Sequence, residues 1–271
     1  MKPREAFQSK KAILCVLVFL IVCSSWAIFY IKPRNTLVQN PVSSQCAKIP
    51  PSLSNALVYY VTSNATPQQT PGEIALTQRI LEKKSPCNFL VFGLGLDSLM
   101  WSSLNHMGRT VFLEENKQWI DIIKSAHPYL ESHLVEYRTK VSQAEALLVR
   151  TKGAEECGVV VDPRVSKCEI AHKEFPQFVY EIEWDVIMVD GPTGYHAEAP
   201  GRMSVIYTAG LMARNTMKGE VDVFVHDVDR VVEDGYSKGF LCEGYVVEQV
   251  GRLRHFRIPS HRMNLGARFC P

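Results

Sequence analysis

Glycine and glutamate residues at a characteristic spacing form the first candidate site in this sequence. Gly93 and Gly95 follow a short apolar segment, and Glu114 and Glu115 follow the next one, about 20 residues further on. Two glycines let the backbone turn sharply and approach a ligand, and a carboxylate at this distance can accept both hydrogen bonds of a ribose diol. Because the third glycine of a dinucleotide-binding loop is missing, we expect Gly93, Gly95 and Glu114 to bind S-adenosylmethionine. The alternative is an ordinary tight turn.

Aspartate and histidine residues after two later apolar segments form the second candidate site. Asp190 directly follows one segment, and His226 and Asp227 follow the other. Asp190 and Asp227 could hold a divalent cation or orient an acceptor hydroxyl group, and His226 or His196 could remove the proton of that hydroxyl. The alternative for each aspartate is a structural role as the cap of the helix that follows.

These residues need a framework that brings distant parts of the chain together, and the apolar segments predict one. Segments with helical periodicity alternate with five short apolar segments, which we expect to be strands at residues 88–92, 110–113, 134–137, 184–189 and 221–225. Residues 245–250 and 252–258 alternate around a glycine and predict an antiparallel hairpin. The fold class is therefore α/β, with a doubly wound, mostly parallel sheet and a C-terminal antiparallel hairpin. Ligands bind beyond the carboxyl ends of the strands in such a sheet.

The N-terminal part of the sequence predicts a membrane anchor. Residues 12–31 are uncharged and mostly apolar, which is the length needed to cross a bilayer. More Lys and Arg residues precede this segment than follow it closely, so the short N-terminus is expected in the cytosol. We expect a cytosolic tail at 1–11, a signal anchor at 12–31, a lumenal stem at 32–71 and the folded domain at 72–271. A cleaved signal peptide is the alternative.

Composition and cysteine content restrict the function further. Lys and Arg number 30 against 28 Asp and Glu, so no broad basic surface for nucleic acid is expected. Six of the eight cysteines lie outside the expected anchor, in an oxidising lumen where disulfides form, and Cys157 with Cys168 could close a local loop. Asn64 begins the sequence's glycosylation sequon, with Pro67 just after it. A tail, one span, a stem and a C-terminal domain are the layout of Golgi-resident type II enzymes.

Several long segments closely resemble the plant glucuronoxylan 4-O-methyltransferases. They lie at residues 88–101, 104–116, 184–195, 198–203, 212–215 and 222–230, and the resemblance covers about residues 72–271. It implies a class I S-adenosylmethionine methyltransferase fold and methyl transfer to O-4 of glucuronic acid side chains of glucuronoxylan. It also implies a Golgi location in secondary cell wall synthesis, beside other xylan-synthesis enzymes.

The implied acceptor is a uronic acid, whose carboxylate suits a bidentate arginine partner. We expect Arg202 rather than Arg230 to bind it, with Tyr195 and His196 as further substrate contacts. Three alternatives remain: an arabinogalactan glucuronic acid methyltransferase, a non-catalytic Golgi scaffold for xylan assembly, and an aminopropyltransferase-like enzyme.

Overall fold

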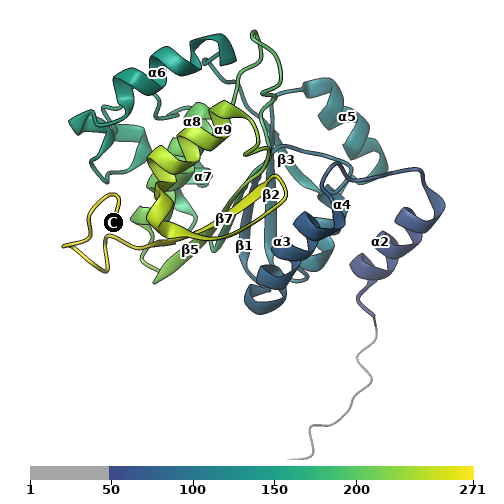
Figure 1. Ribbon diagram of the computed structural model, residues 1–271. Helices are drawn as coiled ribbons and strands as arrows, with labels where there is room; N and C mark the ends of the chain where they lie inside the picture. Colours follow the sequence, from purple (N-terminus) through teal and green to yellow (C-terminus); the bar gives the residue numbers. More distant parts are fainter. Residues whose placement is uncertain (1–48) are drawn as a thin grey trace, which may run out of the picture. The chain divides into compact units, whose positions relative to one another are not determined.

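The computed structural model describes residues 49–271 of this chain (Figure 1). The expected tail at 1–11, the expected anchor at 12–31 and residues 32–48 of the expected stem lie outside the described residues. Within residues 49–271, no helix has both the length and the apolar character needed to cross a membrane.

A seven-stranded sheet forms the centre of the domain, in the order β3-β2-β1-β4-β5-β7-β6. The strands are β1 (Asn88–Phe92), β2 (Arg109–Glu114), β3 (Glu131–Leu134), β4 (Val186–Val189), β5 (Glu220–Val225), β6 (Val246–Val250) and β7 (Leu253–Pro259). The first five are parallel, whereas β7 is antiparallel to both β5 and β6. This topology confirms the predicted doubly wound sheet with a C-terminal hairpin. β3 begins three residues earlier than predicted, because the apolar residues after Leu134 pack beyond the end of the strand.

Helices cover both faces of the sheet, which explains why the central strands are apolar throughout. They are α2 (Pro51–Thr62), α3 (Pro71–Lys84), α4 (Ser98–Leu104), α5 (Lys117–Ala126), α6 (Ala144–Thr151), α7 (Gln177–Glu181), α8 (Met203–Asn215) and α9 (Val231–Tyr236). In β1, Leu90 and Phe92 pack into the core formed with α6 to α9. Phe89 and Val91 point to the opposite face and pack against α3, α4 and α5.

The folded domain begins well before residue 72, the boundary expected from the sequence. Residues 49–271 form one compact unit, and α2 is a full helix in the segment predicted to be a stem. Ala56 of α2 is buried, and the Tyr60 hydroxyl donates a hydrogen bond to the Leu96 carbonyl at 2.6 Å. These contacts with α4 and its preceding loop hold the segment against the domain (Figure 1). Residues 49–71 of the expected stem therefore lie in the same compact unit as the domain.

Two disulfides tie irregular segments to this framework. Cys157 and Cys168 are bonded across 11 residues, as predicted, and the bridge lies in the core beside the sheet. Cys242 and Cys270 join the C-terminal tail to the segment that follows α9. Cys87 is buried and free, so among the described cysteines it departs from the expectation of pairing. Cys46 lies outside the described residues.

Candidate functional site

A cavity of about 890 Å³ lies at the carboxyl ends of the parallel strands. The loops after β1, β2 and β4 supply most of its lining, and the loop after β5 and the segment before α3 supply further residues. Eight of the predicted site residues line it: Gly93, Gly95, Glu114, Asp190, Tyr195, His196, Arg202 and Asp227. Residues from both candidate sites therefore meet in one cavity, as the topology predicts.

The loop after β1 passes very close to the loop after β4. Gly93 has a φ of 110°, and a Cβ atom placed there would lie 3.1 Å from the backbone nitrogen of Gly191. The Gly191 N–H in turn donates a hydrogen bond to the Phe92 carbonyl at 2.6 Å. Glycine is required at Gly93 both for its backbone conformation and for this approach. The result is a bare backbone surface on the cavity wall.

Glu114 connects the glycine loop to the end of β2. Its Oε2 accepts a hydrogen bond from the Leu94 N–H at 3.0 Å, and its Oε1 accepts one from the Asn116 N–H at 2.9 Å. Burial and the neighbouring charge of Glu115 raise the pKa of Glu114 to about 7. A carboxylate has about four acceptor positions, so two remain for a ligand. Glu115 instead accepts a hydrogen bond from the Thr193 N–H and holds the loop after β4.

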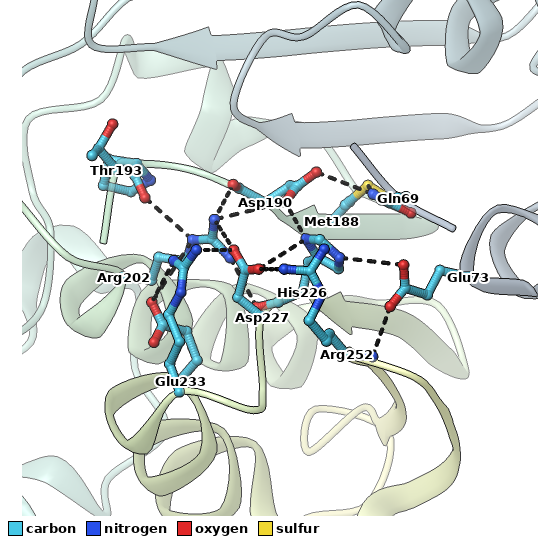
Figure 2. Close-up of polar contacts among 12 residues, drawn as sticks. Gln69, Glu73, Met188, Asp190, Thr193, Arg202, His226, Asp227, Glu233 and Arg252 are labelled. Carbon is cyan, nitrogen blue, oxygen red and sulfur yellow. Dashed lines mark hydrogen bonds and ion pairs between the residues drawn. The ribbon is translucent and has the colours of Figure 1, made fainter. Parts of the chain in front are cut away.

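Asp190 and His226 form a hydrogen-bonded pair, but only Asp190 lines the cavity (Figure 2). His226 Nδ1 lies 2.8 Å from Asp190 Oδ1, and His226 is only 2% exposed. Burial opposes the charges of both groups, but the hydrogen bond and ion pairing outweigh it. The pKa of His226 is raised, and that of Asp190 falls to about 2 through His226 and Arg202. His226 thus lies behind Asp190 and off the cavity lining, where its hydrogen bond orients the carboxylate.

Three arginines surround the carboxylate of Asp227. Arg202 and Arg230 lie 2.8 and 3.0 Å from its Oδ2, and Arg252 lies 2.8 Å from its Oδ1. Ligand atoms of Asp190, His226 and Asp227 come within 4.8 Å of one another, so the predicted metal ligands Asp190 and Asp227 do lie together. A cation there would have to share Asp227 with the guanidinium groups. The divalent cation stays a prediction.

The buried guanidinium of Arg202 is occupied by the protein itself. It donates hydrogen bonds to the carbonyls of Pro192, His226 and Asp190, and it pairs with Asp227. Because Arg202 is only 4% exposed and its donors are used, this arrangement does not favour the expected pairing with a substrate carboxylate. Arg202 instead holds the ends of β4 and β5 together (Figure 2).

Arg230 is better placed for the role expected of Arg202. It also lines the cavity, and its side chain is 30% exposed although it pairs with Asp227 at 3.0 Å and with Glu233 at 3.9 Å. The predicted contacts Tyr195 and His196 lie on the same cavity lining. Tyr195 is 76% exposed, and its ring meets that of His196 edge-on with 4.9 Å between centroids. Tyr195 and His196 thus offer exposed rings on the same cavity lining as the Arg230 guanidinium.

Two residues of the site were not assigned a role from the sequence. Asp97 lines the cavity and accepts a hydrogen bond from the Trp101 indole at 3.0 Å. Burial and the charge of Asp190 raise the pKa of Asp97 to about 6. Gln69 donates a hydrogen bond to Asp190, and nothing in its proline- and glutamine-containing segment indicated that contact.

Comparison with known proteins gives consistent results. A family model described as IRX15/IRX15L/GXM matches residues 72–256. Glucuronoxylan 4-O-methyltransferase 3 of Arabidopsis thaliana is 62% identical over 85% of this chain and 77% of its own length. Glucuronoxylan 4-O-methyltransferase 1 of the same plant is 54% identical over 97% of this chain and 95% of its own.

More distant similarities were also found. Arabinogalactan O-methyltransferase 1 of Arabidopsis thaliana is 48% identical over 77% of this chain and 73% of its own length. Among solved structures, a methyltransferase-like protein of Silicibacter pomeroyi DSS-3 is 14% identical, with a TM-score of 0.40 over 74% of this chain and 95% of that one.

Proposed function

Because this chain belongs to the IRX15/IRX15L/GXM family, we propose that it is an S-adenosylmethionine-dependent O-methyltransferase. Its substrate in this proposal is glucuronoxylan, methylated at O-4 of the glucuronic acid side chains. The observation that carries the choice of acceptor is the 62% identity to a glucuronoxylan 4-O-methyltransferase, against 48% to an arabinogalactan O-methyltransferase.

The residues around the glycine loop fit S-adenosylmethionine. Gly93 and Gly95 line the cavity with backbone atoms, and Glu114 keeps free acceptor positions for the ribose hydroxyls. When bound, S-adenosylmethionine supplies a methyl group on a positively charged sulfur. Gly93, Gly95 and Glu114 would hold it on the side of the cavity formed by β1 and β2.

The acceptor hydroxyl has to be oriented and must lose its proton. Asp190 lines the cavity at the end of β4, and its carboxylate, which stays ionised, can accept a hydrogen bond from that hydroxyl and orient it. His226 holds the Asp190 carboxylate from behind through its hydrogen bond to Oδ1. Asp97 is a second carboxyl group on the same lining, and its pKa of about 6 suits proton uptake near neutral pH.

The acceptor side of the cavity fits a charged sugar in a polymer. Arg230 offers a partly exposed guanidinium on the cavity lining for the uronic acid carboxylate. Tyr195 and His196 offer exposed rings that can pack against neighbouring sugars. These groups adjoin Asp190 on the cavity lining, so a glucuronic acid side chain that reaches Asp190 also comes near Arg230.

The proposal is tested by offering the purified protein two acceptors. With labelled S-adenosylmethionine, we expect label in glucuronoxylan and a product that nuclear magnetic resonance identifies as 4-O-methylglucuronic acid. Much less label is expected in arabinogalactan. Preferential labelling of arabinogalactan would favour that alternative, whereas absence of both binding and transfer would favour the scaffold.

We also propose that the chain is a single-pass protein of the Golgi membrane with its domain in the lumen. The uncharged residues 12–31 support the anchor, and the two disulfides support an oxidising compartment. The full chain should resist carbonate extraction from membranes, and a chain without residues 1–40 should be released. Retention of the shortened chain would contradict the anchor.

A further inference from the structure

Residues that precede and begin α3 reach into the centre of the site. Gln69 is 3% exposed and Glu73 is fully buried, although both lie in a short segment of polar residues. Figure 2 shows them on one side of the Asp190–His226 pair, opposite Arg202. Gln69 lies before residue 72, where the match to the family begins.

Gln69 makes a directed contact with the carboxylate that faces the cavity. Its Nε2 donates a hydrogen bond to Asp190 Oδ2 at 3.0 Å, while His226 holds Oδ1 of the same carboxylate at 2.8 Å. An ionised carboxylate only accepts hydrogen bonds, so the amide must present its nitrogen to Asp190. With one donor on each oxygen, the carboxylate is fixed in one rotation.

Glu73 fixes the segment that carries Gln69. Its Oε1 accepts a hydrogen bond from the Arg252 N–H, and its Oε2 accepts one from the Thr70 N–H, each at 2.7 Å. Its Oε2 also lies 3.6 Å from Nε2 of His226. Glu73 thus joins the start of α3 to the β6–β7 turn and lies against the far edge of the His226 ring. The backbone segment around Gln69 and the Gln69 side chain are therefore both fixed in place.

We propose that Gln69 is a positioning residue for methyl transfer, which orients the Asp190 carboxylate towards the acceptor hydroxyl. This inference rests on the proposed function. Gln69 acts through Asp190, so its removal should slow the chemical step and leave the binding of S-adenosylmethionine intact. A misplaced catalytic group can lower a rate by as much as about a hundredfold.

The test is a double-mutant cycle in the full-length protein with glucuronoxylan as acceptor. Gln69→Leu should lower kcat at least about tenfold, with the KM for S-adenosylmethionine and the melting temperature nearly unchanged. In the Asp190→Asn background, Gln69→Leu should cause little further loss, because the carboxylate that it positions is gone. If the Leu variant does not fold, Gln69→Met replaces it, because methionine matches the length of the glutamine side chain. The same loss of kcat is expected.

Gln78→Leu is the matched control, since Gln78 lies on α3, which Gln69 precedes, and donates a hydrogen bond to Glu82 away from the cavity. It should transfer methyl groups at the normal rate. A folded Gln69 variant with normal kcat would overturn the inference, and so would a double mutant in which the two losses of kcat multiply. In both cases, methylation of glucuronoxylan by the wild type would leave the proposed function standing. If the wild type methylates no glucuronoxylan, the proposed function fails and this inference fails with it.

Discussion

Arg202 and Arg230 both line the cavity, yet their surroundings give them different roles. Arg202 is buried and donates to three carbonyl groups, whereas the Arg230 side chain is 30% exposed. A guanidinium forms such multiple contacts through its planar arrangement of five N–H donors, which lysine lacks. Arg202 is thus a structural residue of the site, and Arg230 is the candidate for recognition.

This difference predicts that substitution of Arg202 lowers stability, whereas substitution of Arg230 weakens binding of the acceptor. Arg202→Lys should lower the free energy of unfolding by about 1–3 kcal/mol, because an ammonium group leaves some of the buried carbonyl groups without a hydrogen bond. Arg230→Gln should raise the KM for glucuronoxylan about tenfold, the loss of one charged hydrogen bond, while S-adenosylmethionine binds normally. Denaturant unfolding and steady-state kinetics measure the two effects. A stable Arg202→Lys protein with a selective increase in KM would restore Arg202 as the acceptor residue.

Glu114 makes cofactor binding depend on pH. Its pKa is raised to about 7, so the carboxylate ionises as the pH rises through neutrality and becomes a better acceptor for the ribose hydroxyls. Glu114→Gln should weaken S-adenosylmethionine binding at pH 8 by about 1.5–3 kcal/mol. Calorimetry at pH 6 and pH 8 should show that the affinities of wild type and variant for S-adenosylmethionine differ more at pH 8. Glu115→Gln, the control, should weaken binding less, and equal affinities of wild type and Glu114→Gln would refute the ribose contact.

At the level of elements, the two disulfides stabilise segments that have no sheet or long helix of their own. Cys242–Cys270 closes a loop with a sequence separation of 28 residues, and it holds the tail whose Phe269 carbonyl accepts hydrogen bonds from buried Arg214. Cys157–Cys168 closes a shorter loop beside α6 and α8. A longer closed loop removes more entropy from the unfolded chain.

Replacing Cys242 and Cys270 together by serine should therefore lower the free energy of unfolding by about 3–4 kcal/mol. The measurement is denaturant unfolding of the purified protein under oxidising conditions. Reducing agent should lower the free energy of unfolding of the wild type by at least as much, because it breaks both disulfides. It should lower that of the double variant by less. A wild-type protein whose unfolding is insensitive to reductant would contradict the disulfide assignment.

The strands could be predicted because their pattern is local, whereas the place of α2 in the domain depends on distant residues. β1 and β4 are buried on both faces, so their apolar segments stand out in the sequence. α2 lies between prolines and polar residues, and only its contacts with α4 and the loop before it show that it belongs to the domain. The same reason explains Gln69 and Arg202, whose partners come from loops far away in the chain.

For the whole molecule, the site follows from the order of the strands. β1 and β4 are neighbours at the centre of the parallel sheet, and their following loops carry Gly93 and Asp190 to the same cavity. Glu114 comes from β2 on one side, and Asp227 comes from β5 on the other. The topology therefore separates a cofactor side from an acceptor side, with Asp190 between them.

The most direct test of this account is methyl transfer by Asp190→Asn. Asparagine keeps the shape of the side chain and removes its charge, so calorimetry should still detect S-adenosylmethionine binding with nearly normal affinity. Labelling of glucuronoxylan should fall by about a hundredfold or more, the scale lost with a positioned acid–base group. An Asp190→Asn protein that methylates glucuronoxylan at the normal rate would contradict the account and leave Asp190 with a structural role only.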